Sequence, residues 1–232
     1  MSIFEDATVK RQAPGQRLLI INPNTNSAVT QGIRAAALGV VEPATEVIAV
    51  NPLVGPYSIE TPDDRAEAEP QLIALLRENL SRRFDAYILG CFDDIGLFEA
   101  RALTQAPVVG TCEAGIAAAR TMARRFSIIT TVHSAVPGIH DILERYGAAD
   151  ICTVRAAGIG VADAASGGDA TKTKLLQTIR EAIEIDGAEA ILLGSGGLAG
   201  KAPALRAHVS VPMIDGIQAA VKMAEGLATQ LG

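Results

Sequence analysis

The stretch Asp85-Ala-Tyr-Ile-Leu-Gly-Cys91-Phe-Asp-Asp94 has a second copy in the chain, Ala188-Glu-Ala-Ile-Leu-Leu-Gly-Ser195-Gly-Gly197. In each copy a short apolar run ends at a glycine, and a small, potentially reactive side chain follows it. The first copy offers the thiol of Cys91 and the second offers the hydroxyl of Ser195. Such runs predict buried strands that present these two residues at their carboxyl ends.

Two further landmarks repeat in the same order around these copies. Ala106-Pro-Val-Val-Gly110 is echoed by Val211-Pro-Met-Ile-Asp215, and Arg17-Leu-Leu-Ile-Ile-Asn22 is echoed by Arg125-Phe-Ser-Ile-Ile-Thr130. Matched landmarks at nearly constant spacing indicate two copies of one α/β unit. We therefore expect an α/β fold of two pseudo-symmetric halves with parallel sheets. If the halves face each other, Cys91 and Ser195 meet across one cleft.

The repeat also predicts how the chain divides. We expect a first half over residues 17–112, completed by a C-terminal helix over 216–232, and a second half over 113–215. Residues 1–16 mix charged and polar types without an apolar centre. They are typical of a loose leader and not of a signal peptide.

Composition narrows the classes of partner. The chain of 232 residues has a formal net charge of -6 and no Lys/Arg cluster, so it lacks the basic surface that binds nucleic acid or anionic membranes. No apolar run is long enough to span a membrane. Three cysteines are too few for a disulfide framework and favour a reducing, cytoplasmic setting. A small-molecule partner is the remaining class.

Two loops near the predicted strand ends have both an architectural and a functional interpretation. Asn22-Pro-Asn-Thr-Asn26 follows the first strand and is either a tight turn before a helix or a polar ligand loop. Asn51-Pro-Leu-Val-Gly-Pro-Tyr-Ser-Ile-Glu60 follows the second strand. It is either architecture or the source of an apolar wall beside the site, through Val54 or Tyr57.

Three patterns predict no separate site. Asp93 and Asp94 follow Cys91 and are interpreted as helix caps in preference to a catalytic acid pair. The histidines share no metal-ligand spacing, so no metal is expected. Gly194-Ser-Gly-Gly-Leu-Ala199 fits a loose dinucleotide pattern, but its first-half twin contains a thiol and two acids, and Lys201-Ala-Pro203 interrupts the helix that should follow.

Together the motifs resemble the hydantoin racemase family, within the aspartate/glutamate racemase superfamily. The resemblance covers nearly the whole chain from Arg17. It is carried by Ile21-Asn-Pro-Asn-Thr25, Gly55-Pro-Tyr-Ser-Ile-Glu60, Gly90-Cys-Phe-Asp-Asp94, Pro107-Val-Val-Gly110, Phe126-Ser-Ile-Ile-Thr130, Asp186-Gly-Ala-Glu189, Leu193-Gly-Ser-Gly-Gly197 and Val211-Pro-Met-Ile-Asp-Gly216.

The resemblance implies a homo-oligomer with a cofactor-independent, metal-independent site between the two halves. In such enzymes two cysteines flank a stereocentre, and one removes a proton while the other delivers one. Cys91 matches one of them, and Ser195 stands where the family pattern has the other. The backbone N–H groups of Phe92 and Gly196 are expected to hold ring carbonyl oxygens. The remaining implied substrate-binding residues are Asn22, Val54, Thr130, Thr131 and Gly197.

Serine at position 195 changes the expected chemistry, because an aliphatic hydroxyl has essentially no conjugate base at neutral pH. The chain is then either an impaired Cys→Ser variant of a racemase or a natural relative with one-base chemistry. The predicted function is racemisation at C5 of 5-substituted hydantoins, with allantoin among the candidates. The alternatives are a one-thiol decarboxylase or isomerase of the same superfamily, and a non-catalytic ligand-binding relative.

Overall fold

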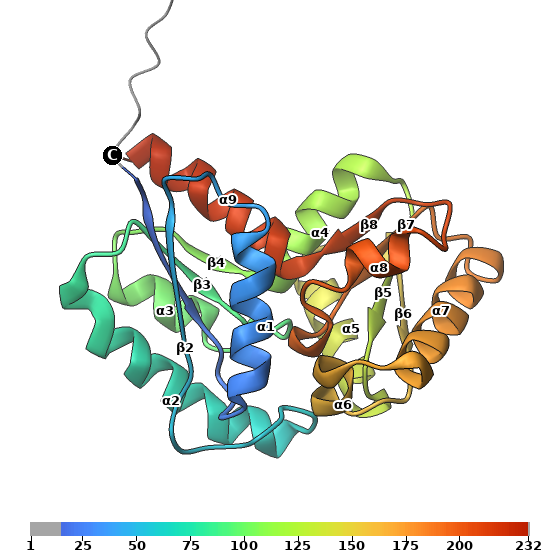
Figure 1. Cartoon of the computed structure of the whole chain (residues 1–232), viewed down its shortest axis with the longest axis horizontal. Helices are drawn as coiled ribbons and strands as arrows, with labels where there is room; N and C mark the ends of the chain where they lie inside the picture. Colours follow the sequence, from blue (N-terminus) through green and yellow to red (C-terminus); the bar gives the residue numbers. More distant parts are fainter. Residues whose placement is uncertain (1–14, 232) are drawn as a thin grey trace, which may run out of the picture.

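The computed structural model describes residues 15–231, so most of the predicted leader lies outside the described residues. Within them, two parallel four-stranded sheets lie side by side (Figure 1). Their strand orders are β2-β1-β3-β4 and β6-β5-β7-β8, which is one topology used twice. The predicted α/β class and the duplicated architecture are confirmed. The division of the chain into domains at residues 112 and 215 stays a prediction.

Strands and helices alternate along each half. The strands are β1 (Arg17–Ile21), β2 (Glu46–Val50), β3 (Ala86–Leu89), β4 (Val108–Gly110), β5 (Phe126–Thr130), β6 (Cys152–Ala156), β7 (Ala190–Leu193) and β8 (Met213–Asp215). The helices are α1 (Ser27–Leu38), α2 (Pro62–Asn79), α3 (Leu97–Leu103), α4 (Thr111–Met122), α5 (Val136–Arg145), α6 (Val161–Ser166), α7 (Asp169–Glu184), α8 (Ala202–Arg206) and α9 (Gly216–Leu231). The Gly/Ala-rich stretch 156–163, whose structure the sequence pattern does not predict, forms the end of β6, a loop and the start of α6.

Local sequence explains where two of the helices begin. The Asn26 side chain accepts the backbone N–H groups of Ala28 and Val29 and so caps α1. Thr61 and Asp64 form a reciprocal capping box at α2, and Pro62 occupies the first turn, where its missing N–H costs nothing. A cap of this kind stabilises a helix by about 1 kcal/mol.

The duplication extends to individual hydrogen bonds. The N–H of Gly90 donates to the carbonyl of Ile21 at 2.8 Å, and the N–H of Gly194 donates to the carbonyl of Ile129 at 2.9 Å. Both bonds continue the pairing of the central strands β1 with β3 and β5 with β7. The residue after each glycine, Cys91 or Ser195, is therefore released from its sheet at the same point.

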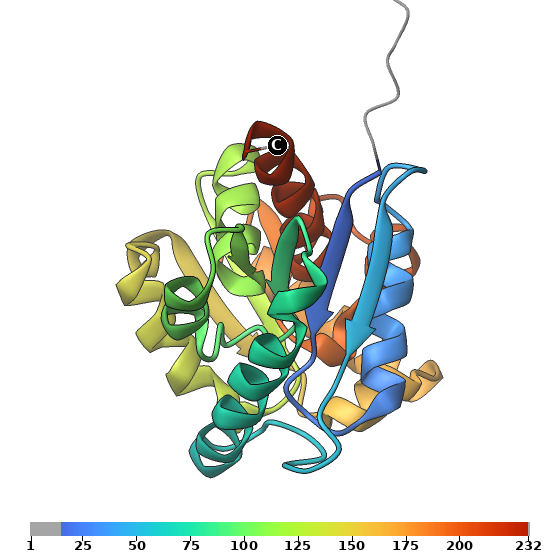
Figure 2. The same ribbon diagram turned by 90° about the vertical axis from the view of Figure 1, so that its left-hand side faces the viewer.

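The two halves exchange one helix each. α4 follows the first sheet, but its Cys112 and Ile116 pack on the second sheet with residues of α5. α9 follows the second sheet, but its Ile217 and Val221 pack on the first sheet together with α1. Figures 1 and 2 show α4 and α9 side by side where the halves meet. The opposite faces are covered by α2 and α3 in the first half and by α7 and α8 in the second.

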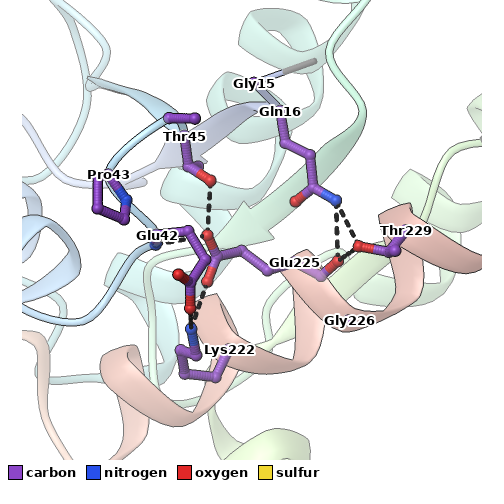
Figure 3. Close-up of a pocket in the computed structure, with 10 residues that line it drawn as sticks. Gly15, Gln16, Glu42, Pro43, Thr45, Lys222, Glu225, Gly226 and Thr229 are labelled. Carbon is purple, nitrogen blue, oxygen red and sulfur yellow. Dashed lines mark hydrogen bonds and ion pairs between the residues drawn. The ribbon is translucent and has the colours of Figure 1, made fainter. Parts of the chain in front are cut away.

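A buried carboxylate anchors α9 to the first half. Glu225 accepts hydrogen bonds from the Glu42 N–H at 3.0 Å and the Thr45 hydroxyl at 2.6 Å, and Lys222 donates to it at 2.8 Å (Figure 3). These residues line a cavity of about 520 Å³ beside the amino ends of β1 and β2. Because its polar side chains are bonded to one another, we interpret this cavity as architecture. No helix among residues 15–231 is both long and apolar enough to cross a membrane.

Candidate active site

A small cleft opens at the carboxyl ends of the central strands of both sheets. Its volume is about 40 Å³, which is room for about one water molecule. Both Cys91 and Ser195 line it. The full lining is Asn22, Asn24, Ile59, Gly90, Cys91, Phe92, Asp93, Thr130, Thr131, Val132, Ala135, Val161, Ser195 and Gly196. The loops are in contact, since a Cβ placed on Gly196 would lie 3.5 Å from the carbonyl oxygen of Gly90.

The backbone around Cys91 is held by two hydrogen bonds. Its carbonyl accepts the Thr111 hydroxyl at 2.7 Å and the Asp94 N–H at 3.1 Å. Burial raises the pKa of the Cys91 thiol well above its usual value, and the charges of Asp93 and Asp94 raise it further. Arg65 acts in the opposite direction but more weakly. The thiol therefore carries its proton in this closed form of the cleft.

The hydroxyl of Ser195 is used as an acceptor. It accepts the Gly197 N–H at 3.3 Å and the Thr131 hydroxyl at 3.4 Å. Its own proton is then free to be donated into the cleft. Gly197 lies behind Ser195 and does not line the cavity, and a Cβ there would meet the carbonyl oxygen of Val161 at 2.4 Å. In this closed form Gly197 thus supports Ser195 through its N–H.

The two predicted backbone donors are in place. Phe92 and Gly196 follow Cys91 and Ser195, and both line the cleft. Within residues 15–231, neither N–H has a protein acceptor. Free N–H groups at matched turns can donate hydrogen bonds to a carbonyl oxygen and so stabilise the negative charge that develops on it.

Asn22, the residue of this loop that the family resemblance implies as a substrate contact, lines the cleft. The Asn22 amide is bonded within its own loop and to the first turn of α1, because Nδ2 donates to Asn24 Oδ1 and to the Thr30 hydroxyl, both at 2.9 Å. Asn24 also lines the cleft, and in the described part of the chain its amide N–H groups donate to no protein group. Asn24 is therefore the better placed donor. The run of asparagines was the signal, but it did not distinguish the two.

Thr130 ends the central strand of the second half, Thr131 follows it, and both of these predicted substrate-binding residues line the cleft. Val54 does not: its side chain is 64% exposed and lies outside the cavity, and Tyr57 is similarly exposed. The apolar wall comes instead from Ile59, Val132, Ala135 and Val161. Ile59 belongs to the same loop as the predicted contact Val54, and in this closed form of the cleft it is Ile59 that lines the cavity.

The two acids after Cys91 have different partners. Asp93 lines the cleft and forms an ion pair with Arg65 of α2. Asp94 accepts the N–H groups of Cys112 and Glu113 at 3.0 and 2.9 Å, so it caps α4. The expectation that it caps the helix immediately after it is corrected. Burial raises the pKa of Asp94 to about 6, against the lowering effect of these bonds. No group of three His, Cys, Asp or Glu side chains in the described residues could hold a metal.

Two alike α/β halves each present one small polar side chain, Cys91 or Ser195, to one shared cleft. The family model for Asp/Glu/Hydantoin racemase matches residues 18–224. This chain therefore belongs to the Asp/Glu/hydantoin racemase family, a class of isomerases.

Individual relatives agree with the family match. A hydantoin racemase of Rhizobium meliloti is 41% identical over 209 residues, which span 90% of this chain and 87% of the relative. A hydantoin racemase of a Pseudomonas species is 37% identical over 90% of this chain and 84% of its own length. An allantoin racemase structure from Klebsiella pneumoniae superposes with a TM-score of 0.90 at 38% identity, covering 93% of this chain and 89% of that one.

Proposed function

We propose that this protein transfers the C5 proton of 5-substituted hydantoins, allantoin among them, with Cys91 as its base. The observation that carries the proposal is the placement of Cys91 and Ser195 on matched loops around one cleft. The hydantoin and allantoin racemases similar to this chain supply the substrate class. A site that needs no cofactor, a homo-oligomeric assembly and a cytoplasmic location stay predictions from the sequence.

In the proposed reaction the Cys91 thiolate takes the C5 proton from one face. The C–H electron pair moves into the ring as an enolate, and the developing oxygen charge is held by the N–H groups of Phe92 and Gly196. The proton then returns from Cys91 to the same face, after exchange with solvent. One donor to such an oxyanion contributes about 10²–10³ in rate.

Ser195 acts in this proposal as a donor and not as a base. A hydroxyl needs a neighbouring general base before it can abstract a proton, and its oxygen already accepts from Gly197 and Thr131. The two faces of the substrate are therefore unequal. Only the enantiomer whose C5 proton faces Cys91 exchanges it, and little inversion accompanies the exchange.

The cleft has to open before a ligand enters. Its volume of about 40 Å³ is far below that of a five-membered ring with two carbonyl groups. Opening also hydrates the thiol, and since burial is the main cause of its raised pKa, hydration favours the thiolate. Ligand entry and activation of Cys91 are coupled in this way.

The test is deuterium uptake at C5. Each enantiomer of a 5-substituted hydantoin is incubated in D₂O with the protein, and label and optical rotation are followed together, with spontaneous exchange subtracted. We expect uptake into one enantiomer only, and Ser195→Cys is expected to add exchange of the other enantiomer and net racemisation. Ser195→Ala is the matched control, because it removes the hydroxyl without adding a thiol.

Three results would contradict the proposal. Equal exchange of both enantiomers by the unmodified chain would contradict the assignment of one face to Cys91. A chiral acid formed from an achiral diacid, without hydantoin exchange, would favour the decarboxylase alternative. Stabilisation by the hydantoin without any exchange would favour the binding protein, because a ligand that binds only the folded state raises stability whether or not it reacts.

A further inference from the structure

Each half contains one buried carboxylate just outside the cleft. Asp94 and Asp215 are 5% and 4% exposed, and neither lines the cavity. Both accept hydrogen bonds from donors that are far from them in sequence. Burying a carboxylate is costly unless several donors satisfy it, so such a group calls for an explanation in terms of what it holds together.

Asp94 joins the Cys91 loop to the start of α4. Its oxygens accept the N–H groups of Cys112 and Glu113, and Tyr146 donates to it at 2.9 Å. Gly110, the residue before α4, has no side chain that could cap the helix. A Cβ there would lie 2.5 Å from the Asp94 carboxyl group, so the glycine makes room for the carboxylate. Asp94 itself adopts a left-handed φ of 49°, which closes the turn after Cys91.

Asp215 joins the Ser195 loop to the start of α9. One of its oxygens accepts the N–H groups of Ile217 and Gln218 at 3.0 and 3.3 Å, which caps the helix. The other oxygen accepts the N–H of Gly200 at 2.6 Å. Gly200 lies in the loop that follows Ser195 and has a left-handed φ of 75°.

The same connection is thus made twice, with the carboxylate at opposite ends. In the first half it belongs to the loop and reaches the helix, and in the second half it belongs to the helix start and reaches the loop. We propose that Asp94 and Asp215 are positioning residues, each of which holds one reactive side chain, Cys91 or Ser195, on its own face of the substrate. This assignment deepens the proposed function and rests on it.

Asparagine substitutions distinguish the loss of the bond between loop and helix from a general loss of stability. In Asp215→Asn the amide oxygen can keep the cap on α9, but the NH₂ group then faces the Gly200 N–H, so only the bond to the loop is lost. In Asp94→Asn the oxygen can keep one of the two α4 bonds. Glu225→Gln is the matched control, because Glu225 is a buried carboxylate that joins α9 to the first half away from the cleft.

The first measurement needs no substrate. Alkylation of Cys91 is followed by peptide mass spectrometry across a pH series, since Cys112 and Cys152 are buried. Asp94→Asn removes a charge beside the thiol, so we expect its alkylation profile to move to lower pH by about half a unit, which is roughly threefold in rate. Asp215→Asn and Glu225→Gln are expected to leave the profile unchanged. A profile that moves alike in all three variants, or in none, overturns the assignment of Asp94.

The second measurement uses Ser195→Cys as the background, where both faces carry a thiol. The two enantiomers are equally stable, so any substitution must slow their interconversion equally in both directions. The rate that can differ between the enantiomers is that of C5 exchange with retention of configuration, and this rate is the one to measure. We expect Asp94→Asn to slow exchange of one enantiomer by about tenfold or more and Asp215→Asn to slow that of the other, since a displacement of 1 Å can cost about 10². Equal slowing of both enantiomers by either variant overturns the proposal.

Failure of the function and failure of the positioning roles give different results. If Ser195→Cys shows no exchange at all, the proposed function fails, and the introduced thiol still reports on its loop through alkylation. In that case an effect of Asp215→Asn on the introduced thiol, without an effect on Cys91, supports the positioning role. Equal effects on both thiols contradict it.

Discussion

In both halves the chain leaves the central strand at a glycine, and Cys91 or Ser195 follows. The two side chains nevertheless lie among different charges. Beside Cys91 lie the carboxylates of Asp93 and Asp94, and both raise the pKa of the thiol. Beside Ser195 lie two glycines and the neutral hydroxyl of Thr131. The duplication has kept the backbone, including the free N–H groups at Phe92 and Gly196, while the side chains have diverged. The two halves therefore have different roles in the proposed reaction. The first half transfers the proton, and the second half forms neutral hydrogen bonds.

Making the halves alike at the reactive position breaks the comparison most severely. In Cys91→Ser both loops present a hydroxyl, which has essentially no conjugate base at neutral pH. We expect C5 exchange to fall by about 10²–10⁴, the range attributed to a positioned acid–base group. Deuterium uptake by NMR measures the loss, and an unchanged urea midpoint shows that the fold is intact. Exchange at more than a tenth of the original rate would mean that Cys91 is not the base.

The pH dependence of exchange sharpens the electrostatic part of the comparison. The thiolate is the active form and its pKa is raised, so the rate rises with pH, by up to about tenfold per unit between pH 6 and 8. Asp94, whose pKa is raised to about 6 by burial, gains its charge at the low end of this range and opposes the thiolate there. We therefore expect a shallower slope near pH 6 than near pH 8. A bell-shaped profile would instead indicate a second titrating group.

The sequence predicted the fold and the positions of Cys91 and Ser195 at the strand ends, because both follow from local patterns of residue type. Apolar runs, the glycines that end them and the matched order of landmarks all lie within short windows. Loop paths depend on distant contacts, which local patterns do not contain. Two hydrogen bonds hold the 51–60 loop: the Thr25 N–H donates to the Pro56 carbonyl, and the Val161 N–H of the second half donates to the Glu60 carboxylate. In this conformation Ile59 lines the cleft and Val54 is exposed to solvent. Asp94 caps a helix that begins 17 residues further on, so its partners could not be read from its neighbours.

The glycines before the two reactive residues offer a matched test of packing. A Cβ on Gly194 would lie 2.4 Å from Ile128 Cγ2 and 3.0 Å from the Phe92 ring, whereas one on Gly90 would have no neighbour nearer than 3.2 Å. Overpacking of this kind costs about 1–3 kcal/mol. We expect Gly194→Ala to lower the free energy of unfolding within this range and Gly90→Ala to lower it less. Urea unfolding compares them, and equal losses would mean that both the Ile128 side chain and the Phe92 ring move aside freely.

The contact between the halves at the mouth of the cleft provides the smallest and most local test. Glu60 ends the loop after β2, and Val161 begins α6 in the equivalent loop after β6. The carboxylate of Glu60 accepts the N–H of Val161 at 2.9 Å. The neighbours Ile59 and Val161 both line the cavity, so this bond closes the cleft from one side. A closed volume of about 40 Å³ does not admit a five-membered ring, so we expect that breaking this bond helps to open the cleft.

Glu60→Ala removes the acceptor and Glu60→Gln keeps one. Water replaces the lost partner when such a hydrogen bond breaks, so the bond stabilises the closed cleft by only about 1 kcal/mol. This corresponds to a change of roughly fivefold in the equilibrium between closed and open forms. We expect Glu60→Ala to lower KM for exchange by about that factor with a smaller change in kcat, because the open form that admits the ligand is more populated, and to speed alkylation of Cys91 by a similar factor. Glu60→Gln should stay within about twofold of the original in both, because the amide oxygen still accepts. If KM rises while alkylation does not, Glu60 affects the ligand directly and the cleft opens by some other route.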